Sequence, residues 1–215
     1  MLTPNQQYIY NWPGWELTLN EHGNEFDALA RDRMVSGGLE LTKYIYKYLL
    51  DTDNSILEVG PFFNPITKEV GSINGKFVTY WENDIHAIQW LKSQKFLFDF
   101  TVEECDLNNI DRDKNSKVVN LFNVVIVSQV FNYINYSHFL KLIRDRIHRN
   151  GLIFINNVVD YGLPKFFSDE RPKSIEETVS LIKMLGFEVI EYEVIPSENI
   201  EFQKHDRLLL AGKVK

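Results

Sequence analysis

The stretch that most restricts the fold of this chain is FNVVIV at residues 122–127, which is apolar on both faces of a strand. Such a strand must be covered on both sides, as happens at the centre of a parallel sheet between two layers of helices. The 215 residues and the hydrophobic fraction of 44% are enough for one α/β domain with a sizeable core. We therefore expect strands and helices to alternate around this segment.

The rest of the chain provides this alternation. Expected helices cover 24–34, 39–50, 65–71, 84–93, 137–149 and 174–186, and expected strands cover 56–59, 77–81, 98–105, 122–127, 152–155, 187–195 and 207–214. The last two strands are separated by 196–206, which is short for a parallel crossover of about a dozen residues, so this pair should be antiparallel. The predicted fold is a Rossmann-like, doubly wound α/β sheet of about seven strands, mostly parallel with an antiparallel C-terminal strand pair.

Residues 1–50 are expected to form an N-terminal helical and aromatic lid segment in front of a main domain of residues 51–215. Aromatic side chains gather near its start, at Tyr8, Tyr10, Trp12 and Trp15. They could pack on the main domain or line a ligand site. They could also form a homodimer contact, so the sequence leaves the oligomeric state open.

The composition argues against several classes of partner. A net charge of -7 disfavours a broad nucleic-acid-binding surface. The single cysteine, Cys105, excludes an internal disulfide and a cysteine-based zinc site, and the five histidines are scattered, so no metal is expected. The first residues lack the pattern of a signal peptide, and no apolar run approaches the roughly 20 residues of a membrane span. We expect a cytoplasmic protein with no membrane partner.

The clearest candidate ligand site is the stretch SILEVGPFFNP at residues 55–65. An apolar strand leads into a turn at Gly60-Pro61 and then to Asn64-Pro65, where a helix can begin with Asn64 as its N-cap. Doubly wound folds build nucleotide pockets in this way, and a glycine lets the backbone approach the ligand closely. An ordinary strand, turn and helix without a ligand is the alternative.

Residues at the ends of four expected strands resemble, in order and spacing, the motifs of class I S-adenosylmethionine-dependent methyltransferases. LEVGPFFNP at 57–65 resembles the first motif, in a variant with Gly-Pro in place of Gly-x-Gly. Glu82 follows the second strand, where the family has its ribose-binding acid. CDL at 105–107 resembles the third-strand motif, and SQVFNYI at 128–134 resembles the segment after the fourth strand. The resemblance covers about residues 40–215.

The resemblance implies an enzyme that binds S-adenosyl-L-methionine and transfers its methyl group to an O or N atom of a small-molecule or sugar-containing acceptor. Glu82 would accept from the ribose hydroxyls, Asp106 from the adenine amino group, and Glu58 would help to hold the amino-acid end through water. Glu82 could instead be a solvated residue at a strand end, and Asp106 a turn cap. The cofactor-binding positions implied are Glu58, Gly60, Pro61, Asn64, Glu82, Asp106, Leu107, Ser128 and Gln129.

Two departures from the family pattern affect the chemistry. Pro61 removes a backbone donor, which disfavours a dinucleotide pyrophosphate more than it disfavours S-adenosylmethionine. Gln129 and Tyr133 stand where relatives often carry histidine, so this segment offers no histidine base. Methyl transfer can depend largely on positioning, and a base is needed only if the acceptor must lose a proton.

The long loop expected at 156–173 should border the acceptor. Substrate-binding candidates are Tyr133, Asn156 and Tyr161, and candidates for a base are Tyr133, His138 and Asp160, with His22 and His205 in expected loops. Arg33 could pair with the cofactor's carboxylate. The chain lacks the Asp/Asn-Pro-Pro-Tyr motif of enzymes that methylate exocyclic amines of nucleic-acid bases.

Two other functions stay open. The missing histidines would also suit a catalytically inactive, methyltransferase-like binding protein. The glycine turn and Glu82 would suit an NAD-dependent oxidoreductase, but the full Gly-x-Gly-x-x-Gly pattern is absent.

Overall fold

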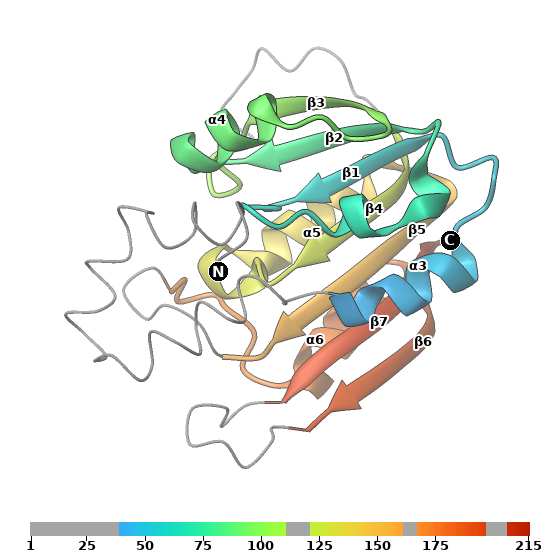
Figure 1. Ribbon diagram of the computed structural model, residues 1–215. Helices are drawn as coiled ribbons and strands as arrows, with labels where there is room; N and C mark the ends of the chain where they lie inside the picture. The colour runs from blue at the N-terminus through green and yellow to red at the C-terminus, as the bar shows by residue number, and fades with distance from the viewer. Residues whose placement is uncertain (1–38, 111–120, 161–166, 197–205) are drawn as a thin grey trace.

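The computed structural model describes residues 39–110, 121–160, 167–196 and 206–215 (Figure 1). Several predictions lie outside these residues and stay predictions: the helix at 24–34, the aromatic cluster near the N-terminus, and the roles of His22, Arg33, Tyr161 and His205. The division between an N-terminal segment and a main domain at residue 50 also stays a prediction.

The described chain is built on a seven-stranded sheet in the order β3-β2-β1-β4-β5-β7-β6. Neighbouring strands from β3 to β5 are parallel, whereas β7 runs antiparallel to both β5 and β6. This arrangement confirms the predicted fold class, including the antiparallel C-terminal pair. The strands are β1 (Ser55–Val59), β2 (Phe77–Glu82), β3 (Asp99–Glu104), β4 (Phe122–Ser128), β5 (Ile147–Val158), β6 (Phe187–Ile195) and β7 (Arg207–Val214).

Helices cover both faces of the sheet, with α3 in front and α5 and α6 behind it in Figure 1. We call these the α3 face, which α4 also covers, and the α6 face. In the described part of the chain, no helix combines the length and apolarity that crossing a membrane requires. The helices are α3 (Thr42–Tyr48), α4 (Ile85–Ser93), α5 (Tyr136–Arg144) and α6 (Ile175–Met184), and the 3-10 turns are η1 (Leu39–Leu41), η2 (Ile66–Glu69), η3 (Gly71–Ile73) and η4 (Phe131–Tyr133).

Strand alternation divides the core into two buried clusters. In β4, Val124 and Ile126 pack on the α3 face, whereas Val125 and Val127 pack on the α6 face. This confirms the central, doubly covered strand predicted from its composition. The alternation also determines to which face each polar residue at a strand end belongs, which matters for the site below.

Two predicted helix starts are confirmed. The carboxylate of Asp84 accepts from the backbone N–H groups of His86 and Ala87, both at 2.9 Å, and so caps α4. The hydroxyl of Ser174 accepts from the N–H of Glu177 at 3.0 Å and caps α6. The reciprocal bond of this capping box starts one residue earlier, because the Glu177 carboxylate accepts from the N–H of Lys173 at 3.1 Å.

The predicted boundary between helix 137–149 and strand 152–155 is wrong. Helix α5 ends at Arg144, and β5 already begins at Ile147, which pairs with Phe122 of β4. Asn150 adopts a φ of 69° where the register shifts, so the Asn-Gly pair marks an irregularity inside the strand. At its other end β5 extends to Val158 because β7 pairs with it that far. The loop expected at 156–173 is correspondingly shorter.

Candidate functional site

The parallel strands β1 to β5 end at one edge of the sheet, which we call the carboxyl edge (Figure 1). The predicted residues Glu58, Glu82 and Ser128 lie within the last two residues of β1, β2 and β4. Asn156 lies near the end of β5. The fold therefore brings together most of the positions that the motifs indicated, and in open α/β sheets this edge is where ligands bind.

Backbone strain is concentrated at the same edge. Among the described residues other than glycine, Phe62, Gln129 and Asp160 have φ values of 50°, 58° and 52°, and each follows the end of a strand. Such conformations cost about 1 kcal/mol or more each, and they persist where surrounding contacts impose them. Their distribution favours a functional role for this edge.

Gly60 begins the turn after β1 with a φ of 62°. A Cβ at this position would lie 2.7 Å from Cγ2 of Val130, in the segment after β4. The N–H of Gly60 donates to the carbonyl of Trp81 in β2 at 2.8 Å. Pro61 is buried and its carbonyl accepts from the N–H of Asn64 at 3.0 Å. The glycine thus allows close packing of the segments that follow β1 and β4.

The prediction that Asn64 caps a helix is wrong. The N-cap position of η2 is occupied by Pro65, not by Asn64, and no side-chain hydrogen bond caps the turn at that position. Instead Glu58, with 1% of its surface exposed, accepts from the N–H groups of Ile66 at 2.6 Å and Thr67 at 3.1 Å, and from the Thr67 hydroxyl at 2.6 Å. Burial raises the pKa of Glu58 to about 7, although these hydrogen bonds act in the opposite direction. Through these hydrogen bonds, the Glu58 carboxylate holds η2 against the end of β1.

Glu82 holds two loops together at the end of β2. One carboxylate oxygen accepts from the N–H of Phe62 at 2.8 Å, and the other accepts from the N–H groups of Asn83 at 2.8 Å and Asp84 at 3.0 Å. Burial raises the pKa of Glu82 above its ordinary value, against these three bonds. A carboxylate offers about four acceptor positions, so the oxygen that binds Phe62 can accept one more donor.

Asp106 and Leu107 lie one and two residues beyond Cys105, which follows β3. They lie near Glu82, since the N–H of Cys105 donates to the Glu82 carbonyl at 2.9 Å. The Asp106 carboxylate forms a turn by accepting from the N–H of Asn108 at 3.0 Å. Leu107 packs against the core cluster of the α6 face. Asp106 is thus both a turn cap and a partly exposed acceptor beside the ribose-binding candidate.

Ser128, Gln129 and Asn156 are directly linked. The N–H of Gln129 donates to the Asn156 carbonyl at 2.7 Å, and the Gln129 side-chain oxygen accepts from the N–H of Val158 at 3.1 Å. The amide nitrogen of Asn156 donates to the Ser128 hydroxyl at 3.1 Å. Gln129 is therefore committed to holding β4 and β5 together, whereas Ser128 is partly exposed at the edge.

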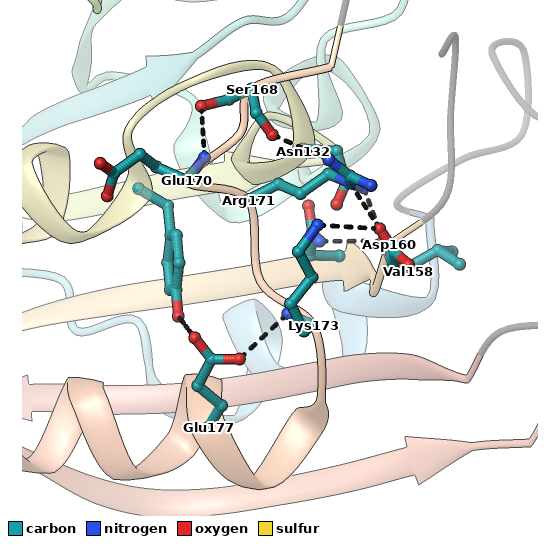
Figure 2. A network of polar contacts seen from close by, with 10 residues as sticks. Asn132, Val158, Asp160, Ser168, Glu170, Arg171, Lys173 and Glu177 are labelled. Atoms are coloured by element: carbon teal, nitrogen blue, oxygen red, sulfur yellow. Dashed lines mark hydrogen bonds and ion pairs between the residues drawn. The ribbon is translucent and has the colours of Figure 1, made fainter.

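The segment after β5 is bonded to the segment after β4 (Figure 2). The buried Asn132 donates from its side chain to the carbonyl of Val158 at 2.7 Å, and its backbone carbonyl accepts from the N–H of Ser168 at 2.9 Å. The ring of Tyr133 lies 6.2 Å from that of Phe167. The predicted acceptor-side elements thus form one connected wall.

Asp160 lies at the centre of a charged network in that wall. Figure 2 shows the Arg171 and Lys173 side chains converging on its carboxylate, with the lysine nitrogen at 3.5 Å. Burial raises the pKa of Asp160, but the hydrogen bond and charge of Arg171 outweigh it and the net direction is downward. A carboxylate with a lowered pKa is a poor proton acceptor, so this environment disfavours Asp160 as a general base. His138 is exposed on the first turn of α5.

Sequence reasoning missed several residues at this edge. Thr67 and Tyr80, whose hydroxyls are 2.7 Å apart, complete the surroundings of Glu58, and Arg171 neutralises Asp160. Arg207 is buried at the start of β7 and pairs with Glu40 of η1 at 2.7 Å. A charged residue opening the apolar run of β7 was the available signal for Arg207. Nothing in the sequence distinguished Thr67.

The class I S-adenosylmethionine-dependent methyltransferase fold has this strand order, with an antiparallel β7. It also has a glycine turn after β1 and an acid at the end of β2, as found here. The remaining acceptor position of Glu82 suits one ribose hydroxyl, and the neighbouring Asp106 suits an amino group, so the residues present fit this cofactor. Among the described residues, no group of three or more His, Cys, Asp or Glu side chains could hold a metal ion.

Solved structures agree with this fold. The chain is similar to an S-adenosylmethionine-dependent methyltransferase from Mesorhizobium loti, with a TM-score of 0.59 and 11% identity over 82% of this chain and 100% of that one. The N-methyltransferase NodS from Bradyrhizobium japonicum WM9, in complex with S-adenosyl-L-homocysteine, gives a TM-score of 0.61 and 13% identity over 98% and 96%. The [4+2]-cyclase SpnF gives 0.62 and 12% over 82% and 80%. No family model and no curated protein matches the chain. The resemblance is thus confirmed for the fold.

Proposed function

We propose that this protein is an S-adenosyl-L-methionine-dependent methyltransferase that acts on an O or N atom of a small-molecule or sugar-containing acceptor. The observation that carries the proposal is the position of Glu82. Its carboxylate binds the turn after Gly60 through the Phe62 N–H, and it lies beside Asp106 at the carboxyl edge. A glycine turn and two acidic side chains are thereby assembled where this fold takes a nucleoside.

The cofactor would be held by residues from several strand ends. Glu82 would accept from a ribose hydroxyl, Asp106 from the adenine amino group, and the backbone at Gly60 would pass close to the amino-acid end. Glu58 would contribute indirectly, because it bonds to η2 and so fixes the end of the segment that begins at Gly60. When bound, S-adenosylmethionine supplies a methyl group on a sulfonium that is already a good leaving group.

The acceptor would lie beside the wall formed by the segments after β4 and β5. Tyr133 and Asn156 are the described candidates for contact with it, and Tyr161 stays a prediction outside the described residues. The ion pair of Asp160 with Arg171 fixes the wall, which leaves positioning of the acceptor as the main contribution of these residues. A cytoplasmic location and the absence of a nucleic-acid or membrane partner belong to the same proposal.

The solved structures support the cofactor more than the reaction. NodS is an N-methyltransferase with S-adenosyl-L-homocysteine bound, whereas SpnF is a [4+2]-cyclase. A second candidate function is therefore a protein that keeps the fold without methyl transfer, such as a binding protein. An NAD-dependent oxidoreductase is less well supported, since Pro61 lacks the N–H that a pyrophosphate would use.

The deciding experiment is calorimetric titration of the purified protein with S-adenosylhomocysteine and, separately, with NAD. Wild type should bind S-adenosylhomocysteine. Glu82→Gln, which keeps an acceptor oxygen but removes the charge, should bind about ten- to a hundredfold more weakly, as expected for loss of about 1.5–3 kcal/mol from a charge-assisted bond. Glu188→Gln changes an exposed glutamate in β6 and serves as the matched control.

The possible results separate the alternatives. If wild type and Glu82→Gln bound S-adenosylhomocysteine equally well, Glu82 would not be the residue that binds the ribose. Binding of NAD without S-adenosylhomocysteine would support the oxidoreductase, and binding of neither would contradict the methyltransferase. If S-adenosylhomocysteine binds, transfer of a labelled methyl group to small-molecule acceptors distinguishes the enzyme from the binding protein.

A further inference from the structure

Arg207 is a buried cation at the carboxyl edge with part of its hydrogen-bonding capacity unused. Only 8% of its surface is exposed, and Nη1 donates to a carboxylate oxygen of Glu40 at 2.7 Å. Within the described part of the chain, its buried Nε atom has no hydrogen-bond partner. Arg207 is opposite Val158 in the antiparallel pair of β5 and β7, which places it beside the wall described above.

Asn156 provides a second buried polar atom of the opposite kind. The side chain is completely buried, and its nitrogen donates to Ser128 at 3.1 Å. Its oxygen Oδ1 is buried and, among the residues described, has no hydrogen-bond partner. The edge therefore holds an unused donor on Arg207 and an unused acceptor on Asn156.

The two residues lie on the same face of the sheet. Asn156 pairs with Leu209, which packs on the α3 face, and Arg207 lies two positions from Leu209 along β7. Diagonal neighbours of this kind in an antiparallel pair are about 7–8 Å apart. At that spacing of the two residues, both side chains can reach one small ligand that accepts hydrogen bonds at one end and donates one at the other.

Buried polar atoms without partners are uncommon, so their position needs an explanation. Arg144 offers a comparison, because its Nε is also buried and, in the part of the chain described, without a partner. However, the Arg144 side chain is 41% exposed and packs against Gly186 before β6, at the opposite end of the sheet. An unpaired Nε alone is therefore not a site. Arg207 differs from Arg144 because it lies beside the unpaired oxygen of Asn156 at the carboxyl edge.

We propose that Arg207 and Asn156 form a subsite that recognises a carboxylate beside an amino or hydroxyl group, as in α-amino acids and α-hydroxy acids. The inference rests on the proposed function and narrows its acceptor to small organic acids. With Nη1 on Glu40, the edge formed by Nε and Nη2 matches the two oxygens of a carboxylate. Asn156 Oδ1 accepts from the neighbouring amino or hydroxyl group. One guanidinium that already has one carboxylate partner suits a monoanion better than a phosphate dianion.

The competing explanation is that Arg207 only attaches η1 to the sheet through Glu40. The two explanations predict different behaviour at Nε. If the pair is purely structural, added acids do not change the environment of Nε. The side-chain Nε–Hε resonance of Arg207 in isotope-labelled protein therefore gives a direct readout, and its loss in Arg207→Lys assigns it. L-serine and L-lactate are the probes, each compared with its amide, serinamide or lactamide.

Serine or lactate should shift the Arg207 resonance with saturation, and the amides should not. Arg207→Lys keeps the charge but loses the fork, so it should bind the acid about ten- to a hundredfold more weakly. Arg144→Lys is the matched control and should bind as wild type does. If Arg207→Lys folds poorly, Glu40→Gln provides a second test. It keeps the Arg207 guanidinium but removes the carboxylate that competes for it, so acid binding should be retained.

The inference would be overturned if neither acid shifted the Arg207 resonance, or if the amides shifted it equally. Calorimetry with S-adenosylhomocysteine on the same samples keeps the two proposals apart. Binding of S-adenosylhomocysteine without any acid response would refute the subsite and leave the methyltransferase intact. An acid response without S-adenosylhomocysteine binding would refute the methyltransferase and with it the status of the acid as a methyl acceptor.

Discussion

Glu58→Gln should change how the stability of this protein depends on pH. Glu58 is buried without a cationic hydrogen-bond partner in the described part of the chain, and its carboxylate accepts from two backbone N–H groups and one hydroxyl. Burial raises its pKa from the ordinary 4.5 to about 7. A rise of this size corresponds to about 3 kcal/mol between the protonated and the charged forms.

The sign follows from proton binding in the two states. Between pH 4.5 and about 7 the folded protein keeps the Glu58 proton that the unfolded chain has lost. The stability is therefore higher at acid pH and falls as the pH rises through this window. Glutamine cannot ionise, so the Glu58→Gln variant lacks this loss. The stability of wild type relative to the variant should fall by about 3 kcal/mol across the window.

Urea unfolding at a series of pH values measures this difference. Other titrating groups, including Glu82 with its raised pKa, contribute to both proteins and cancel in the comparison. Glu188→Gln, at an exposed position, should follow wild type at every pH. A difference between wild type and Glu58→Gln that does not vary with pH would refute the reasoning. It would mean that the carboxylate is solvated, as expected if it faced a bound cofactor through water.

Three further changes test other contacts. Gly60→Ala should lower the melting temperature, because the new Cβ would lie 2.7 Å from Val130 and the residue would keep a φ of 62°. Adding Val130→Ala should restore part of the melting temperature, and no recovery would contradict the steric explanation. Ser174→Ala removes the cap of α6 and should cost about 1 kcal/mol in urea unfolding, whereas no loss would show that the cap is replaceable. Asp160→Asn should release Arg171 and Lys173, so trypsin should cut faster after Lys173, which Ser174 follows. An unchanged cutting rate would show that the hydrogen bonds of the wall suffice.

Local patterns predicted most of the fold, and long-range pairing explains where they failed. The spacing of Leu140, Ile143 and Ile147 suits a helix, and only the pairing of Ile147 with Phe122 shows that the last of the three belongs to a strand. That partner lies far away in the sequence, so a helical period cannot reveal it. The end of β5 was missed for the same reason, since its final pairs are with β7.

At the candidate site, the motifs predicted which residues meet at one edge of the sheet but not the direction of each side chain. Glu58 was expected beside the cofactor, yet strand alternation places it with Ile56 on the α3 face, under η2. The period of two was available in the sequence and would have suggested burial. The partners were not, because Thr67 reaches Glu58 only after the turn folds back over the strand. Arg207 and Glu40 are separated by most of the chain and could not be paired from sequence.

The burial of Glu58 and Glu82 has one consequence for ligand binding. Glu82 fixes the start of the segment after Gly60 at the Phe62 N–H, and Glu58 fixes its end at the N–H groups of Ile66 and Thr67. The segment is thus held at both ends by the protein's own carboxylates before any ligand arrives. A loop that is already ordered loses little conformational entropy on binding, which favours affinity. The ribose would add one hydrogen bond to an existing arrangement, and Glu82→Gln should weaken both that bond and the arrangement that positions it.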